Sequence, residues 1–197
     1  MTPQAESVLE LFRSTGAYLE GHFRLTSGLH SAEYLQCALV LQHPAAAERL
    51  GRSLAQELRT LAPEKIDLVA SPALGGLIIG HEVARALGTR FLFTERDAAT
   101  GKMTLRRGFT VAPGETAVVV EDVITTGGST TDVIEVLRAA GASVLAAGSI
   151  IDRSGGRADV GVPRVALATL QVAAHHIEDC PLCARGIPLA KPGSRPT

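Results

Sequence analysis

The sequence predicts an α/β protein with a mostly parallel central sheet flanked by helices, and a small N-terminal hood or flap. Two observations support this class. Short, β-branched apolar segments alternate with segments of helical period, and glycine or proline separates them. Such an alternation requires right-handed crossovers between parallel strands. With 197 residues the chain suits one domain: about 1–40 form the N-terminal helix and hood, 41–170 the α/β core, and 171–197 a C-terminal segment and tail.

The N-terminal part is expected to form a helix and a hairpin. Apolar residues recur at helical spacing over Glu6–Arg13, and Gly16 ends that helix. Two short strands, Ala17–Leu25 and Glu33–Ala38, are expected around a turn at Ser27-Gly28. We expect this hairpin to cover the edge of the central sheet.

The core is expected to hold five strands and three helices. The strands are short apolar runs at Ile66–Ala70, Phe91–Thr94, Ala117–Val120, Ser143–Ile151 and Arg164–Leu170. The helices are expected at Pro44–Leu61, from the glycine turn after Ala70 to Leu87, and from about Gly128 to Ala140. Pro44 suits a first helical turn, and glycines follow the last two helices.

Composition excludes several classes of partner. The net charge is −1, the pI is near 6.6, aromatic residues make up 4% and tryptophan is absent, so neither a nucleic-acid nor a membrane-surface partner is expected. No apolar run reaches about 18 residues, and the N-terminus has no basic segment of the signal-peptide type. A cytoplasmic location is therefore expected, and three cysteines do not suggest a disulfide scaffold.

The most informative stretch is the run from Val118 to Thr130. An apolar strand leads to Glu121 and Asp122, and a loop rich in Thr, Gly and Ser, Thr125–Thr130, leads into a helix. Open α/β sheets bind ligands where strands end, and a helix N-terminus attracts phosphate. Carboxylates beside such a loop suit ribose hydroxyls, or a Mg²⁺ that the ligand brings. The alternative is an ordinary strand-to-helix connection with a Ser or Thr cap.

This stretch resembles the ribose-5-phosphate-binding motif of the type I phosphoribosyltransferases. The resemblance implies that family's fold and 5-phosphoribosyl-1-pyrophosphate (PRPP) as a substrate. It implies Mg²⁺ as cofactor, bound mainly through PRPP with no direct protein ligand. It assigns PRPP binding to Glu121, Asp122, Val123, Ile124, Thr125, Thr126, Gly127, Gly128 and Ser129.

A second loop of similar form follows the strand that ends at Ala70. Its glycines, Gly75 and Gly76, would let the backbone approach an anion closely. By position in the family, Ala73, Leu74, Gly75 and Gly76 would hold pyrophosphate. The alternative is a plain β–α turn.

The polar segment Glu95–Phe109 is expected to be a long mobile loop or a hairpin. It carries Arg96, Lys102, Arg106 and Arg107, and cations from a closing loop would neutralise pyrophosphate as it leaves. The resemblance implies catalytic roles for Arg96 and Lys102, in a loop that reaches the neighbouring site of a homodimer. The segment departs from the family's better-known form, which has more lysines and a histidine. For Arg106 and Arg107 a solvated hairpin face is favoured.

The hood narrows the resemblance to the orotate phosphoribosyltransferases. Phe23, Ser27 and Tyr34 stand in a flap pattern of that branch, although Thr26 and Leu29 replace a lysine and an arginine of many members. The alternative is a plain hairpin with a Ser-Gly turn. The resemblance assigns orotate binding to Phe23, Ser27, Thr125 and Arg153. A guanidinium suits a planar ring with a carboxylate, and the alternative for Arg153 is a surface ion pair with Asp152.

The implied reaction transfers a phosphoribosyl group from PRPP to orotate. Glu121 and Asp122 would hold the ribose hydroxyls beside the developing cation, and Asp122 is the best candidate for a base. Two alternatives stay open: a purine or xanthine phosphoribosyltransferase, and a PRPP-sensing regulator that is not an enzyme. The hood and Arg153 argue against the first, and the slightly acidic chain without a spare domain argues against the second.

A Cys-x-x-Cys pair lies near the C-terminus. Cys180 and Cys183 follow His175 and His176, which leaves a zinc site, a redox pair or a reduced structural turn as readings. Adjacent histidines point poorly at one metal, and a second Cys-x-x-Cys is missing, so the structural turn is favoured.

Overall fold

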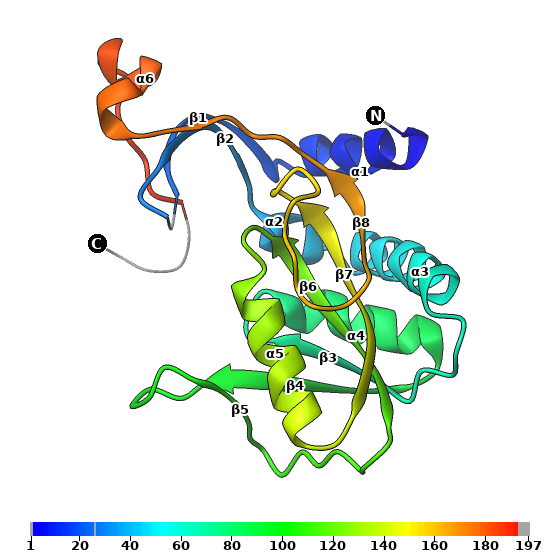
Figure 1. The fold of residues 1–197 in the computed structure, drawn as a ribbon. Helices are drawn as coiled ribbons and strands as arrows, with labels where there is room; N and C mark the ends of the chain where they lie inside the picture. The colour runs from blue at the N-terminus through cyan, green and yellow to red at the C-terminus, as the bar shows by residue number, and fades with distance from the viewer. Residues whose placement is uncertain (1, 26, 193–197) are drawn as a thin grey trace.

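A computed structural model describes residues 2–25 and 27–192, and its core is a six-stranded sheet (Figure 1). The strand order is β5-β4-β3-β6-β7-β8, and all neighbours are parallel except β4 and β5. The strands are β3 (Leu68–Pro72), β4 (Arg90–Arg96), β5 (Met103–Leu105), β6 (Thr116–Ile124), β7 (Ser143–Asp152) and β8 (Arg164–Thr169). The expected α/β class is confirmed. That all 197 residues form one domain stays a prediction.

Helices cover both faces of this sheet. They are α1 (Pro3–Ser14), α2 (Cys37–Leu41), α3 (Pro44–Leu61), α4 (Gly76–Leu87), α5 (Gly128–Ala139), the 3₁₀ helix η1 (Ile177–Asp179) and α6 (Pro181–Ala184). Helices α1, α3 and α4 lie on one face and α5 lies on the other. None of the helices within residues 2–25 and 27–192 has the length and hydropathy needed to cross a membrane.

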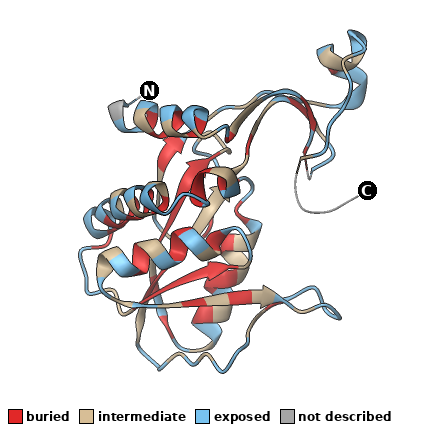
Figure 2. Ribbon diagram, turned by 180° about the vertical axis from the view of Figure 1, so that it is seen from behind, coloured by how far each residue is buried: buried red, intermediate tan, exposed pale blue. Residues whose placement is uncertain are grey.

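The central strands are apolar because both their faces are covered. Side chains alternate between the two faces of a strand. In β6, Val118 and Val120 pack toward α3 and α4, whereas Ala117 and Val119 pack toward α5. Figure 2 shows the resulting pattern, with buried residues along the sheet and exposed residues on the outer sides of the helices. This explains the uninterrupted apolar run of the motif strand.

The hood is a separate antiparallel sheet of three strands. It consists of β1 (Tyr18–Arg24), β2 (His30–Leu35) and β9 (Ala174–His175), in that order. The turn at Ser27-Gly28 is confirmed, and Gly28 has φ +83°. The expected second strand, Glu33–Ala38, is placed too late, because Cys37, Val40 and Leu41 form the buried face of α2 instead. The third strand comes from the C-terminal segment and was not expected.

Strand β6 continues past the point where the sequence predicted its end. Its pairing with β3 stops at Ala70↔Val119, but its pairing with β7 runs on to Ile124↔Asp152. Glu121 and Asp122 therefore lie within the last part of the strand, on a stretch that β3 no longer covers. This uncovered part of β6 faces the cavity beneath the hood, which Asp122 and Val123 line.

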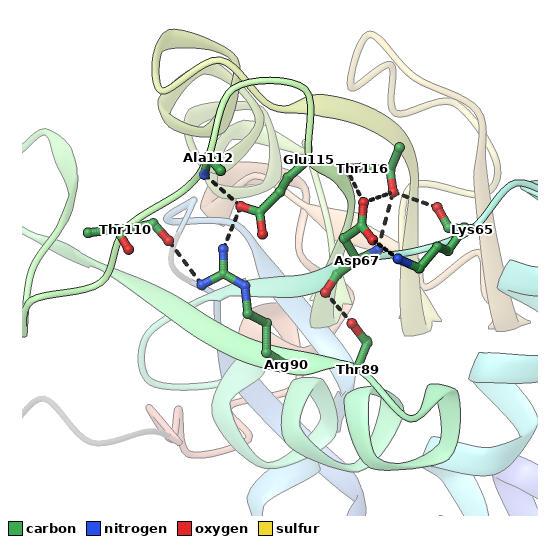
Figure 3. A network of polar contacts seen from close by, with 8 residues as sticks. All are labelled: Lys65, Asp67, Thr89, Arg90, Thr110, Ala112, Glu115 and Thr116. Carbon is green, nitrogen blue, oxygen red and sulfur yellow. Dashed lines mark hydrogen bonds and ion pairs between the residues drawn. The ribbon is translucent and has the colours of Figure 1, made fainter.

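A polar network joins the amino ends of β3, β4 and β6 (Figure 3). The Asp67 carboxylate accepts hydrogen bonds from the backbone N–H and the hydroxyl of Thr116, at 3.1 and 2.9 Å, and pairs with Lys65 at 2.8 Å. Arg90 pairs with Glu115 at 2.5 Å. These contacts hold the strands in register at the end of the sheet opposite the motif loop.

Candidate active site

A cavity of about 680 Å³ lies between the hood and the carboxyl ends of β6 and β7. The hood contributes Leu25, Ser27, Leu29 and Tyr34, and the strand ends contribute Asp122, Val123, Thr125, Thr126 and Arg153. Open α/β sheets bind ligands at this edge. The structure thus brings residues predicted for PRPP and residues predicted for orotate into one cavity.

Glu121 and Asp122 point to different sides of β6. The Glu121 carboxylate accepts a hydrogen bond from the Thr130 hydroxyl on α5. Burial, with a smaller effect of the Asp122 charge, raises the pKa of Glu121 from its ordinary value to about 7, although the Thr130 contact opposes this. Asp122 lines the cavity, and its Oδ1 accepts a hydrogen bond from the N–H of Val123 at 2.9 Å. Burial also raises the pKa of Asp122.

The Thr125–Ser129 loop presents backbone and hydroxyl groups around the start of α5. Gly127 has φ +87°, and a Cβ there would lie 2.7 Å from Val160 Cγ1, so only glycine fits. Gly127 is also the N-cap and supplies no side-chain acceptor to the first turn of α5. Thr125, Thr126 and Gly128 are exposed. The arrangement suits a phosphate bound to helix N–H groups.

The loop between β3 and α4 lies directly beside Asp122. A Cβ on Gly75 would come 2.6 Å from Asp122 Oδ1, and one on Gly76 would come 2.7 Å from Ser71 Cβ. The Ala73–Leu74 peptide bond is cis, and the Leu74 side chain is 76% exposed. Ala73, Leu74, Gly75 and Gly76 thus form a second backbone-rich wall next to the strand-end carboxylates.

The segment after β4 is a hairpin, which confirms one of the two forms expected for it. Arg107 pairs with Glu95 at 2.8 Å on its exposed side, as favoured for a solvated face. Arg96 pairs with Asp132 of α5 at 2.8 Å, and its guanidinium lies 3.5 Å from Ser129 Oγ. Arg96 and Lys102 line a second hollow, of about 470 Å³, and not the main cavity. Within its own chain, Lys102 is therefore not brought to the motif acids.

Arg153 lines the cavity at the end of β7, and the alternative of a surface ion pair with Asp152 is wrong. The Asp152 carboxylate is 1% exposed and pairs with Arg164 at 2.7 Å. Among the residues that the structure describes, no carboxylate pairs with Arg153. Burial lowers the pKa of Arg153, and the nearby Tyr34 partly offsets this. A guanidinium at a cavity wall without a protein anion is suited to an anionic ligand.

Phe23 does not line the cavity. It is 8% exposed and packs against Tyr34, with ring centroids 5.9 Å apart, so it supports the hood from behind. Thr26, which replaces a family lysine, lies outside the described residues. Of these two aromatic residues, Tyr34 and not Phe23 lines the cavity.

Several lining residues were missed by sequence reasoning. Arg157 lines the cavity, and its backbone N–H donates to Ser154 Oγ at 2.9 Å in the turn that follows Arg153. The Gly155-Gly156 pair marks that turn in the sequence and could have pointed to Arg157. Val172 and Ala174 also line the cavity. They come from the C-terminal segment, and no sequence signal places that segment beside the hood.

Comparison with known proteins agrees with this geometry. The family model of the phosphoribosyl transferase domain matches residues 38–176. The orotate phosphoribosyltransferase of Pelotomaculum thermopropionicum is 54% identical over 190 residues, which cover 96% of this chain and 97% of the relative.

Solved structures show the same fold. The crystal structure of orotate phosphoribosyltransferase from Aeropyrum pernix superposes with a TM-score of 0.65 at 28% identity, covering 83% of this chain and 94% of that one. Adenine phosphoribosyltransferase from Saccharomyces cerevisiae also reaches a TM-score of 0.65, at 21% identity, covering 83% of this chain and 99% of that one. The second likeness concerns the fold alone, so overall shape does not distinguish the base. The 54% sequence identity to an orotate phosphoribosyltransferase over 96% of this chain does distinguish the base. This chain belongs to the orotate phosphoribosyltransferase family.

Proposed function

We propose that the cavity beneath the hood is where this protein transfers the 5-phosphoribosyl group from PRPP to orotate. The products are orotidine 5′-monophosphate and pyrophosphate, and the reaction belongs to pyrimidine biosynthesis. The observation that carries the proposal is a juxtaposition. Asp122, the Thr125–Thr126 start of the phosphate loop and Arg153 line the same cavity.

The PRPP end of the cavity is assigned to the β6–α5 segment. The 5-phosphate would bind the Thr125–Ser129 loop, whose glycine N-cap leaves the first N–H groups of α5 without a side-chain acceptor. Asp122 would hold the ribose hydroxyls from the cavity wall, whereas Glu121, predicted for the same role, does not line the cavity and accepts a hydrogen bond from Thr130. Cleavage at the anomeric carbon builds positive charge on the ribose ring, so carboxylates nearby stabilise that transition state.

The leaving pyrophosphate is assigned to the β3–α4 loop. Its backbone lies close to the Asp122 carboxylate, since a Cβ added to Gly75 would come 2.6 Å from Asp122 Oδ1. The residues present fit a Mg²⁺ brought by PRPP, because carboxylate oxygens such as those of Asp122 are the ligands that this hard cation prefers. When bound, Mg²⁺ supplies Lewis-acid stabilisation of the leaving group. The cation is expected to be held mainly by PRPP itself.

The orotate end is assigned to Arg153 and the hood. Orotate is planar and carries a carboxylate, and a guanidinium presents paired N–H donors that match it. Ser27 and Tyr34 close the cavity from the other side. The orotate ring nitrogen can lose its proton before attack, so no general base is required. Asp122 is the residue placed to accept a proton if one is transferred in the step.

The cationic hairpin is proposed to act on a neighbouring subunit in a homodimer. Support comes from its position, since Lys102 is exposed and lines a different hollow from Asp122 in its own chain. A loop that closes over a neighbour's pyrophosphate would neutralise charge and exclude water. The homodimer and the cytoplasmic location stay predictions.

The proposal is tested by measuring PRPP- and Mg²⁺-dependent loss of free base with purified protein. Orotate, uracil, hypoxanthine, guanine and xanthine are run in parallel. Turnover confined to orotate is expected. Turnover of a purine would keep the PRPP site and overturn the base assignment. Binding of PRPP without turnover of any base would favour a regulator.

A further inference from the structure

Two histidines of the hood converge with the Cys-x-x-Cys pair of the C-terminal segment. Figure 1 shows that segment, with α6, beside β1 and β2. His22 lies on β1 and His30 begins β2, while Cys180 is the N-cap of α6 and Cys183 lies within that helix. One nitrogen or sulfur atom from each of the four lies within 4.8 Å of every other.

The separations match one tetrahedral metal ion. His22 Nε2 lies 2.9 Å from His30 Nδ1, and Cys183 Sγ lies 3.2 Å from His30 Nδ1. The distances from His22 Nε2 to Cys180 Sγ and Cys183 Sγ are 3.5 and 3.7 Å. Around Zn²⁺, ordinary bond lengths place two nitrogens about 3.3 Å apart, nitrogen and sulfur about 3.6 Å apart, and two sulfurs about 3.8 Å apart.

The orientation of His22 is set by a hydrogen bond outside the cluster. Its Nδ1 lies 2.8 Å from the backbone carbonyl of Ile187. A carbonyl oxygen only accepts, so Nδ1 carries the proton and Nε2 directs a lone pair at the cluster. Metal-binding histidines are held in this way by a partner on the other ring nitrogen.

Three of the four residues in the cluster are buried, which separates it from a chance surface grouping. His22 and His30 are each 3% exposed and Cys180 is 2% exposed, whereas Cys183 is half-buried. With little access to water, their nitrogen and sulfur atoms contact mainly one another. A bound cation would satisfy all four atoms at once.

The histidines next to the cysteines in sequence are not the ones that meet them. His175 and His176 do not belong to the cluster, so the zinc set that the sequence offered as one alternative, His175 and His176 with Cys180 and Cys183, is not the set that the fold brings together. His175 lies on β9 and pairs in register with His30. It is the His30 side chain that contacts the cysteines, at 3.2 Å from Cys183 Sγ. The ligands come from segments about 150 residues apart, as the 153-residue separation of His30 and Cys183 shows.

We propose that His22 Nε2, His30 Nδ1, Cys180 Sγ and Cys183 Sγ bind one Zn²⁺ in a closed structural site. Two thiolates and two imidazoles in tetrahedral array are the donor set of structural zinc, with no position left for substrate. Binding releases the two thiol protons. Zinc at this site would take no part in the bond changes of the proposed reaction.

The proposed zinc would tie the C-terminal segment to the hood. That link now rests on the two-residue β9 pairing and on hydrogen bonds such as Arg24 N–H to the Ala190 carbonyl at 2.8 Å and Ala190 N–H to the His22 carbonyl at 2.8 Å. Both parts line the cavity, through Ser27 and Tyr34 on one side and Val172 and Ala174 on the other. Zinc would thereby hold the orotate wall in shape.

The test is the metal content of wild-type protein purified without chelator, with Co²⁺ substitution as a second readout. About one zinc per chain is expected. After replacement by Co²⁺, tetrahedral visible bands and a thiolate-to-cobalt charge-transfer band are expected. Wild-type protein that holds no stoichiometric zinc and gives no such spectrum would overturn the proposal. A Cys180–Cys183 disulfide, seen as the loss of two hydrogens by mass spectrometry, would overturn it in favour of a redox pair.

Variants separate the four ligands from their neighbours. Cys183→Ser and His30→Gln are each expected to lower zinc retention at least about tenfold against a competing chelator. His176→Ala, an exposed neighbour outside the cluster, is the matched control and should retain zinc. Equal retention in Cys183→Ser and His176→Ala would contradict the assignment. If Cys183→Ser does not fold, Cys183→His supplies another zinc ligand and should restore binding with a weaker charge-transfer band.

Discussion

The α/β core and the hood hold their parts of the site in different ways. The core is a sheet covered on both faces, and its motif is contiguous, from the buried Val118 to the first turn of α5. The hood has three short strands, and one of them, β9, comes from residues more than a hundred positions away in the chain. Its centre is polar, with His22, His30 and Ser31 buried.

In the proposed function, this difference separates the groups that bind PRPP from the groups that select the base. Under that proposal, the core presents the carboxylates and the phosphate loop that bind PRPP. The hood, together with Arg153 at the end of β7, supplies the wall proposed to face the base, and contacts between distant segments shape the hood. We therefore expect core substitutions to abolish turnover with every base, and substitutions at the orotate end to change which base reacts.

The largest expected effect is at Asp122. Asp122→Asn should lower kcat by about 100-fold or more, because it removes a carboxylate from beside the developing ribose cation. Steady-state turnover of orotate checks this, with thermal unfolding to confirm that the variant is folded. A near-wild-type kcat in folded protein would remove Asp122 from the mechanism.

Replacing Lys102 should lower kcat less than replacing Asp122, and the affected site should be that of the neighbouring subunit. Lys102→Ala is expected to lower kcat by about 10- to 100-fold, because one exposed cation no longer neutralises pyrophosphate. The matched control is Lys65→Ala, at the opposite end of the sheet, which should leave kcat unchanged. An unchanged kcat for Lys102→Ala would move the role to Arg106.

Mixing two impaired variants tests whether the hairpin acts on the neighbouring subunit. Equal amounts of Asp122→Asn and Lys102→Ala should regain about a quarter of wild-type activity, since half of the dimers are hybrids with one complete site. Subunit exchange is verified by native mass spectrometry. Hybrid dimers without activity would place the hairpin over its own chain's site.

Glu121 should give the core a pH-dependent stability. Its pKa is raised by burial from 4.5 to about 7, so the folded state holds a proton that the unfolded state releases. The stability it contributes is fully present below pH 4.5 and is lost as pH rises through about 7. Glu121→Gln should flatten this part of the stability curve, measured by urea unfolding between pH 5 and about 8. The exposed Glu178→Gln is the control, and an unchanged slope in Glu121→Gln would contradict the burial argument.

The smallest effect is expected at the far end of the sheet. Hydrogen bonds from Lys65, and then from Thr116, lower the pKa of Asp67 to about 2. Asp67 therefore adds stability above its ordinary pKa of 3.8 that is lost as pH falls through about 2. Asp67→Asn should lower the Tm by roughly 2–4 °C at pH 7 with kcat unchanged. A fall in kcat in folded Asp67→Asn would mean that strand register at the amino end of the sheet affects the geometry of the active site.

The sequence predicts the locally encoded elements of the core well, and it predicts less well the features that depend on pairing between distant segments. Pro44–Leu61 was predicted to the residue, because a proline at the first turn and a sustained helical period are local signals. Glu121 and Asp122 were placed after the strand instead of within it, because pairing with β7 extends β6 beyond its apolar run. Local patterns do not contain such tertiary pairing.

The candidate site shows the same limit. Asp122, Thr125 and Arg153 were predicted from motifs and share the cavity. Phe23 was expected to face the base but is buried behind Tyr34, because strand register decides which side of the hood it occupies. Arg157, Val172 and the His22–His30 pairing with the cysteines depend on how distant segments meet, which spacing along the chain does not reveal.

The most direct test of the division between core and orotate end is the kinetics of Arg153→Ala with both substrates. We predict that kcat/KM for orotate falls by about 10- to 100-fold, the scale of a lost hydrogen-bonded charge pair, while KM for PRPP stays within about twofold of wild type. Arg138→Ala, an exposed arginine that donates to the Gly161 carbonyl, serves as the control. An unchanged kcat/KM for orotate, or an equal rise in KM for PRPP, would contradict the assignment of Arg153 to the base.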